Sequence, residues 1–217
     1  MIEAVIFDMD GLMIDSEVIC YEVYRDLLRH DNIELTKQQY TLCFAGKTMT
    51  NGLLCAREYF HLNFDIDDAE KFSVQKEKEY VEEKGVALKP GLLELLRYLK
   101  NNNMKCAIAT SSGLERIHQL VDKYDILKHY DVITCGHEVC NGKPAPDIFL
   151  KACEKLGVKP ENALVLEDSE AGIQAGYSAH IPVICIPDMK YPSDKYQEMT
   201  TAVLGSLEDV IDYIEGK

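Results

Sequence analysis

Residues 4–17 read Ala-Val-Ile-Phe-Asp-Met-Asp-Gly-Leu-Met-Ile-Asp-Ser-Glu, an apolar run that ends abruptly in carboxylates and a glycine. The run at 4–7 has the short length and continuous apolarity of a strand that is covered on both of its faces. Asp8 and Asp10 follow it directly. The first expected strand therefore carries acidic groups at its carboxyl end.

Similar apolar runs recur along the chain and alternate with helical patterns. The further expected strands are 105–109, 131–134, 163–166 and 182–186. This alternation is typical of βαβ units. The sequence thus predicts an α/β fold built on a doubly wound, Rossmann-like parallel sheet.

Two of the expected helices carry an apolar stripe at i, i+3, i+4 and i+7 spacing, which would pack against the sheet. The stripes are Leu92, Leu95, Leu96 and Leu99, and Leu207, Val210, Ile211 and Ile214.

The interval from about residue 15 to residue 84 interrupts the alternation, because it holds helical patterns but no convincing strand. Its last part, 67–84, is rich in charged residues, as is usual for a solvated helix face. We expect a helical insert at 16–84 within a core formed by 1–15 and 85–217.

The chain of 217 residues carries 23 Lys plus Arg against 37 Asp plus Glu, a formal net charge of −14. A surface of this sign repels polyanions, so neither nucleic acid nor an anionic membrane is an expected partner. No apolar run approaches the roughly 18 residues of a membrane span, and no basic signal segment opens the chain. We expect a cytoplasmic protein and, in the absence of a heptad pattern, a monomer.

The eight cysteines are scattered, several of them inside apolar runs. Buried free thiols in a reducing compartment explain this distribution better than a disulfide framework does. Cys135 and Cys140 have no second pair elsewhere, so their spacing does not predict a metal site.

Ligands of an open parallel sheet bind beyond the carboxyl ends of its strands. The polar groups expected at that edge are Asp8, Asp10, Thr110, Ser111, Lys143, Glu167 and Asp168. Several carboxylates in one crevice repel one another unless a cation lies among them, and oxygen ligands of this kind suit Mg²⁺. A lysine and a hydroxyl supply donors for a phosphoryl group.

Each of these residues alone has an ordinary structural explanation, as a turn residue, a surface charge or an acidic start of a helix. Their joint placement after separate strands favours function. The set predicts phosphoryl transfer through a carboxylate nucleophile.

Four stretches, 8–17, 109–112, 142–147 and 166–172, resemble the four motifs of the haloacid dehalogenase superfamily. The sequence Gly-Lys-Pro-Ala-Pro-Asp at 142–147, together with an insert after the first motif, resembles the branch that holds phosphatases and β-phosphoglucomutases. The resemblance covers essentially the whole chain. It implies that the insert is a helical cap that closes over the site.

The resemblance also implies roles. Asp8 would be the nucleophile and would form an aspartyl phosphate, and Asp10 would be the acid and base. Mg²⁺ would be held by the carboxylates of Asp8 and Asp168 and by the backbone carbonyl of Asp10. The phosphoryl group would be bound by Thr110 and Lys143, with Ser111 as a further candidate, and Glu167 would either bind the metal or support its ligands.

Specificity would lie in the cap, where Lys47 of the loop 46–48 is a candidate substrate contact. An ordinary helix start explains Lys47 equally well. The expected substrate is a small phosphorylated metabolite, whose identity the sequence does not disclose.

Three functions compete. A Mg²⁺-dependent phosphomonoesterase hydrolyses the aspartyl phosphate, whereas a β-phosphoglucomutase-type enzyme returns the phosphoryl group to another hydroxyl of a sugar. The mutases carry a histidine shortly after the first motif and a cap arginine near residue 46, and this sequence has neither. The third, a phospho-aspartate signalling receiver, needs no insert after its first strand. We therefore favour the phosphatase.

Overall fold

The computed structural model describes residues 2–216. By its internal contacts the chain forms two compact units. The first comprises the residues up to Ile14 together with those from Leu88 onward, and the second is Asp15–Ala87.

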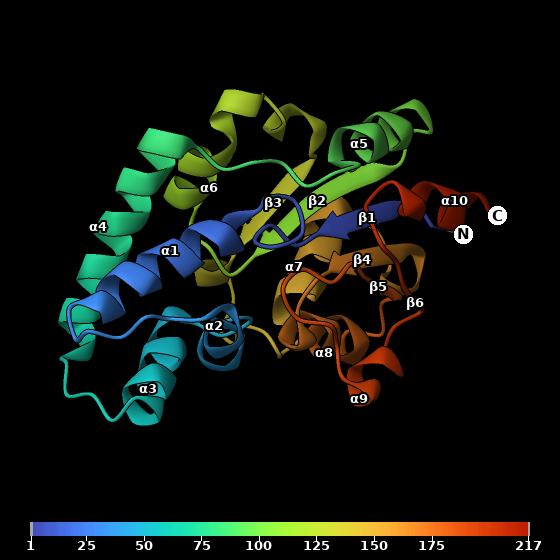
Figure 1. The fold of residues 1–217 in the computed structure, drawn as a ribbon. Coiled ribbons are helices and arrows are strands. Elements are labelled where there is room, and N and C mark those ends of the chain that lie inside the picture. The colour runs from blue at the N-terminus through green and yellow to red at the C-terminus, as the bar shows by residue number, and fades with distance from the viewer. Residues whose placement is uncertain (1, 217) are drawn as a thin grey trace. The chain divides into compact units, whose positions relative to one another are not determined.

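In the first unit, six strands of the described chain form one parallel sheet in the order β3-β2-β1-β4-β5-β6 (Figure 1). The strands are β1 (Ala4–Phe7), β2 (Lys105–Thr110), β3 (Val132–Cys135), β4 (Ala163–Glu167), β5 (Val183–Cys185) and β6 (Ala202–Val203). The α/β class and the doubly wound sheet are confirmed. The sequence did not predict β6, because its two residues form no apolar run.

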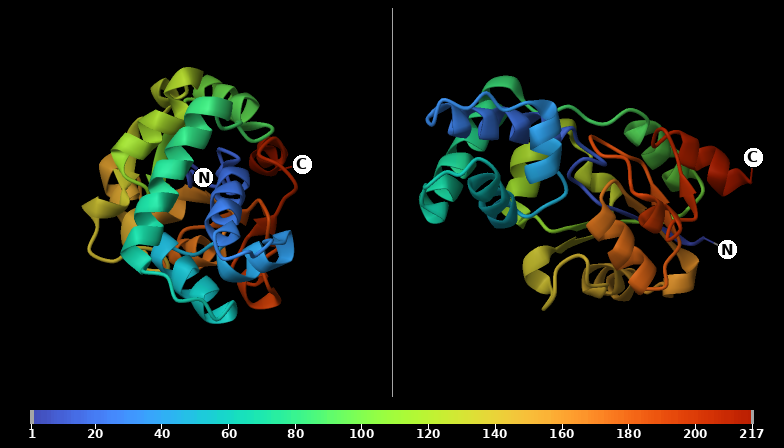
Figure 2. Two further views of the ribbon diagram at one scale, coloured as in Figure 1. Left: turned by 60° about the vertical axis from the view of Figure 1, so that its left-hand side comes forward. Right: turned by 60° about the horizontal axis from the view of Figure 1, so that its bottom comes forward.

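The helices of this unit are α5 (Leu92–Asn101), α6 (Leu114–Val121), α7 (Asp147–Leu156), α8 (Glu170–Ser178), α9 (Asp194–Gln197) and α10 (Asp209–Glu215). Short 3₁₀ helices cover Asp122–Tyr124, Leu127–His129, Gly136–Glu138 and Pro160–Asn162. Figure 1 shows α7 and α8 on one face of the sheet and α5 and α10 on the other, and the turned view on the right of Figure 2 shows the same layers.

The core of this unit lies between the sheet and its helices. Alternate residues of β1 point to opposite faces, and Ala4 and Ile6 join a buried cluster with Phe149 of α7 and Ile173 of α8. The predicted stripe of α5 is confirmed, since its four leucines are buried. The second stripe is confirmed in part. Helix α10 begins at Asp209, so Leu207 is buried ahead of the helix rather than in it.

The second unit contains helices and no strand. They are α1 (Ser16–Arg29), α2 (Lys37–Cys43), α3 (Met49–Tyr59) and α4 (Ile66–Lys84). Helix α4 packs against α1 and α3, and the rings of Tyr24 and Phe44 stack with centroids 4.0 Å apart. The predicted helical character of this segment is thereby confirmed, and its role as a cap stays a prediction.

All eight cysteines are free thiols; five are buried, Cys20 and Cys55 are half-buried, and Cys140 is exposed. None of the described helices is long and apolar enough to cross a membrane.

Candidate active site

The strand order places Asp8 at the switch point of the sheet. Strand β1 lies between β2 and β4, and Phe7 is in register with Leu166 of β4 and Ile108 of β2. The backbone N–H of Asp8 donates to the carbonyl of Leu166 at 3.0 Å. Because parallel strands in register end together, Asp8 lies beside Glu167. Ligands of doubly wound sheets bind at such a point.

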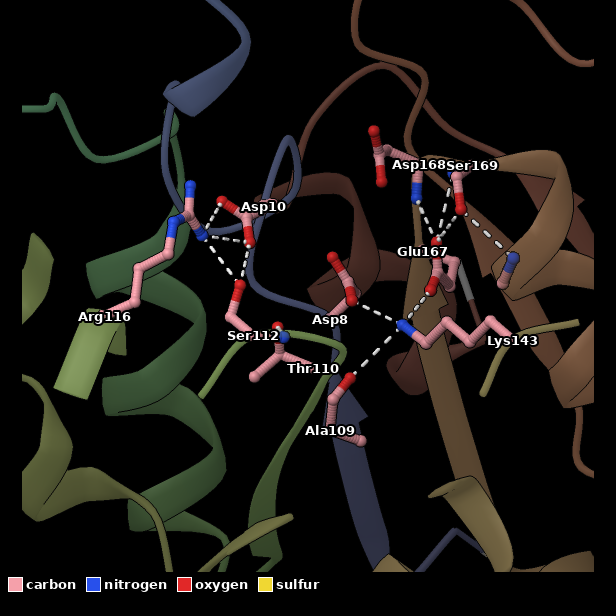
Figure 3. Close-up of polar contacts among 11 residues, drawn as sticks. Asp8, Asp10, Ala109, Thr110, Ser112, Arg116, Lys143, Glu167, Asp168 and Ser169 are labelled. Carbon is pink, nitrogen blue, oxygen red and sulfur yellow. Dashed lines mark hydrogen bonds and ion pairs between the residues drawn. The ribbon is translucent and has the colours of Figure 1, made fainter. Parts of the chain in front are cut away.

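Lys143 bridges the two carboxylates that end β1 and β4 (Figure 3). Its Nζ donates to Asp8 Oδ1, to Glu167 Oε1 at 2.5 Å and to the carbonyl of Ala109 at 3.3 Å. The side chains of Lys143, Asp8 and Glu167 are 7%, 10% and 0% exposed. The predicted neighbours on three separate segments thus come together in one buried ion-pair cluster.

The cluster perturbs the pKa values of its members. Burial raises the pKa of Asp8 to about 7, the charge of Lys143 opposes this shift, and Glu167 adds to it. Burial also disfavours the charge of Lys143, but the two carboxylates outweigh it and raise the pKa of the ammonium above its ordinary value. Lys143 therefore stays charged, whereas full ionisation of Asp8 near neutral pH requires further positive charge nearby.

Glu167 is held by donors on both of its oxygens. Oε2 accepts from the backbone N–H groups of Asp168 and Ser169, both at 3.1 Å, and from the Ser169 hydroxyl at 3.0 Å. With Lys143 on Oε1, Glu167 accepts from four donors in all, three of them on Oε2. These contacts fit the supporting role expected for Glu167, and one of its oxygens also belongs to the acidic group formed with Asp8 and Asp168.

Asp168 completes a group of carboxylates that could hold a metal ion. Carboxylate oxygens of Asp8, Glu167 and Asp168 lie within 4.8 Å of one another, the one such acidic or metal-ligating group found among residues 2–216. Gly11 allows this approach, because a Cβ at its position would lie 2.3 Å from Asp168 Oδ2 and its φ is +81°. Closely spaced oxygen donors of this charge fit Mg²⁺.

The second expected motif ends β2. Thr110 is buried, and its Oγ1 accepts from the backbone N–H of Ser112 at 3.1 Å. Ser111 is exposed, so nothing in its burial distinguishes it from a loop residue. Both lie at the same edge of the sheet as Asp8, as the sequence predicts.

Two residues near Asp10, Ser112 and Arg116, were not predicted as site residues. Arg116 Nη1 donates to Asp10 Oδ1 at 2.8 Å and to Oδ2 at 2.7 Å, and the Ser112 hydroxyl donates to Oδ2 at 2.9 Å (Figure 3). Ser112 and Arg116 are four residues apart, a spacing that puts them on one side of a helix start. That spacing was the available signal.

Lys47 belongs to the second unit. Its Nζ donates to the carbonyl of Leu42 and lies 3.9 Å from Cys55 Sγ. These contacts are local, and a role for Lys47 in substrate binding stays a prediction.

A doubly wound sheet that presents clustered carboxylates and a buried lysine at its switch point defines a class of α/β enzymes with an acidic catalytic centre. Residues 5–186 match the model of the haloacid dehalogenase-like hydrolase family, and the chain belongs to that family.

Curated relatives agree with the family. The chain is 34% identical over 179 residues to a phosphorylated carbohydrates phosphatase of Thermotoga maritima, covering 82% of each chain. It is 32% identical over 215 residues to a mitochondrial (DL)-glycerol-3-phosphatase of Arabidopsis thaliana, covering 94% of this chain and 70% of the relative.

A β-phosphoglucomutase of Clostridium difficile has the same fold, with a TM-score of 0.81 and 24% identity over 100% of this chain and 96% of that one. The family match and the curated relatives make the protein an enzyme of this hydrolase family and rule out the signalling receiver. At this identity the likeness to the mutase concerns the fold alone.

Proposed function

We propose that the protein is a Mg²⁺-dependent phosphomonoesterase that acts on a small phosphorylated metabolite through an aspartyl phosphate on Asp8. The observation that carries the proposal is the buried contact of Asp8 with Lys143, beside the acidic group formed with Asp168. The names of the two curated relatives favour a phosphorylated carbohydrate or polyol as substrate.

In the first step, a carboxylate oxygen of Asp8 attacks the phosphorus atom and the bond to the leaving oxygen breaks. Asp10 gives its proton to that oxygen, so the alcohol leaves neutral. In the second step, water attacks the phosphorus of the aspartyl phosphate, Asp10 takes a proton from this water, and inorganic phosphate and the Asp8 carboxylate are released.

Lys143 supplies positive charge to the phosphoryl oxygens, and Thr110 at the end of β2 offers a hydroxyl to them. The buried position of Lys143 strengthens its contribution, because water screens it little. Glu167 keeps the ammonium in place from the side of β4.

The residues that would hold Mg²⁺ are Asp8 and Asp168, through their carboxylates, and Asp10, through its backbone carbonyl. When bound, the ion neutralises charge on the phosphoryl oxygens and on the carboxylates. Its binding should also be visible without turnover, because a ligand of the folded state raises the temperature of unfolding.

The test is phosphate release from a panel of sugar, polyol and aryl phosphates. We expect release by the wild type with Mg²⁺, its loss in excess chelator, and a fall of several orders of magnitude in Asp8→Asn, whose amide cannot form the phospho-intermediate. Asp212→Asn, at an exposed position of α10, is the matched control and should retain full activity. Turnover by Asp8→Asn at a near-normal rate would overturn the assignment of the nucleophile.

A further inference from the structure

Arg116 forms a compact polar group with Asp10 and Ser112 (Figure 3). A single guanidinium nitrogen, Nη1, contacts both oxygens of the Asp10 carboxylate and also lies 2.7 Å from the Ser112 hydroxyl. The hydroxyl in turn donates to Asp10 Oδ2. Asp10 is therefore held by two side chains from the segment that follows β2.

The environment of this group is partly sheltered. The side chains of Arg116 and Asp10 are 26% and 30% exposed. Hydrogen bonds between ionised partners are stronger than neutral ones, and the rigid guanidinium fixes the direction of its donors. The contact restricts the rotation of the carboxylate more than an exposed ion pair would.

The local chain links this group to the phosphoryl-binding end of β2. The backbone N–H of Ser112 donates to Thr110 Oγ1, and α6 begins at Leu114, two residues later. Arg116 lies in the first turn of α6, four residues after Ser112. Thr110, Ser112 and Arg116 thus belong to one short, hydrogen-bonded strand-to-helix connection.

We propose that Arg116, assisted by Ser112, is a positioning residue that orients Asp10 for proton transfer to the leaving oxygen and from the attacking water. The inference rests on the proposed phosphatase function. When Asp10 gives up its proton, the guanidinium compensates the carboxylate charge that forms. When Asp10 takes the proton back from water, the same contacts keep its carboxylate in the same orientation.

A positioning role makes a kinetic prediction that a structural role does not. Proton donation matters most for a poor leaving group, so Arg116→Met should lower kcat on an alkyl phosphate about tenfold and on 4-nitrophenyl phosphate by less than about threefold. The KM of each substrate should change by no more than about twofold. Arg97→Met, an exposed arginine that pairs with Glu94 on α5, is the matched control and should leave both constants unchanged.

The decisive measurement is a double-mutant cycle with Asp10→Asn. If Arg116 acts through Asp10, the variant that carries both substitutions is no slower than Asp10→Asn alone. Ser112→Ala removes a smaller group, carries little risk to folding, and should show a weaker loss of kcat, about threefold, with the same lack of additivity. Circular dichroism and thermal unfolding establish that each variant is folded.

Three results would overturn the inference. They are an unchanged kcat in Arg116→Met, losses that multiply in the double variant, and a rise in KM confined to substrates with a second anionic group. The last would make Arg116 a substrate-binding residue. Failure of the proposed function itself is distinguishable, because the wild type would then release no phosphate from any substrate, whereas a wrong inference leaves the wild type active.

Discussion

At the scale of single residues, the site depends on one buried ammonium that serves two carboxylates. Removing one partner of a buried ion pair leaves an uncompensated charge, which typically costs about 3–5 kcal/mol. Lys143→Met leaves both Asp8 and Glu167 in that position. In excess chelator we expect its free energy of unfolding, measured in urea, to fall by about 3 kcal/mol. Lys151→Met, which breaks an exposed pair on α7, is the control and should leave the free energy of unfolding nearly unchanged.

The deficit of Lys143→Met should also depend on pH. The pKa of Asp8 is about 7 in the folded protein, above its ordinary value of 3.8, and loss of the lysine charge raises it further. The folded state then binds a proton that the unfolded state has released, so stability falls as the pH rises above the unfolded value. Below about pH 7 Asp8 keeps this proton in both folded proteins, so the gap to wild type should be constant there and should widen between about pH 7 and pH 9, where only the variant keeps the proton. A constant gap over this range would mean that Asp8 does not carry the effect.

Site residues at the ends of strands were predictable from the sequence, whereas a site residue inside a helix was not. The predicted residues Asp8, Lys143 and Asp168 each lie after an apolar run or in the loop that follows it. They could be assigned to one site because ligands bind beyond the carboxyl ends of parallel strands. Arg116 follows no strand end. It lies inside a helix, where a cation is usually a solvated charge, and its contact with Asp10 arises only from the direction of α6.

At the scale of elements, the start of α8 is shaped around Glu167. Ser169 caps the helix by accepting from Gly172 N–H, and a Cβ at Gly172 would lie 1.8 Å from Glu167 Oε1. Alanine normally stabilises a helix by about 1 kcal/mol relative to glycine. Here we expect the opposite, because the methyl group must displace a buried carboxylate.

Gly172→Ala should therefore lower the free energy of unfolding by about 1–3 kcal/mol, the usual cost of overpacking. It should also reduce kcat at least about tenfold, since Glu167 would no longer hold Lys143. Gly205→Ala is the control, as it lies outside the site and a Cβ there meets only Asp209 Oδ2, at 3.4 Å. Thermal unfolding and phosphate release measure the two effects, and a Gly172→Ala protein as stable and active as the control would contradict this explanation of the glycine.

Elements were predictable where many residues share one pattern. Strands β1 and β4 are buried throughout, so their apolar runs stand out in the sequence. Strand β6 has only two half-buried residues, and it exists because Thr201 and Leu204 bond to β5. Such a strand forms because β5 offers it backbone hydrogen bonds, and its own two residues carry no pattern that predicts it.

At the scale of the whole molecule, the strand order brings residues from distant segments of the sequence together in one site. Asp8 and Asp168 are 160 positions apart in the sequence and become neighbours because β1 and β4 pair. The alternation of runs predicted a parallel sheet, but the order β3-β2-β1-β4-β5-β6 follows from pairing between segments that no local pattern specifies. The choice between water and a sugar as phosphoryl acceptor likewise depends on residues outside the core site.

Both candidate reactions pass through phosphorylated Asp8, so the core residues do not distinguish them. The sequence lacks the histidine after the first motif and the cap arginine that the mutases carry, and an acceptor phosphate would have no bidentate partner there. Given β-glucose 1-phosphate with a trace of glucose 1,6-bisphosphate, the enzyme should release inorganic phosphate or leave the sugar unchanged. Coupled assays for glucose 6-phosphate and for free phosphate measure the two outcomes.

The same assays also test the role of Lys47 in the second unit. Rapid formation of glucose 6-phosphate with little free phosphate would replace the phosphatase by a mutase, and Lys47 would then be the leading candidate for the distal phosphate. In that case Lys47→Ala should raise KM more than it lowers kcat, because a contact equally strong in the ground and transition states affects binding alone. If the enzyme is a phosphatase for a substrate with one phosphate, Lys47→Ala should leave turnover of 4-nitrophenyl phosphate unchanged, since that substrate offers no second anion to bind.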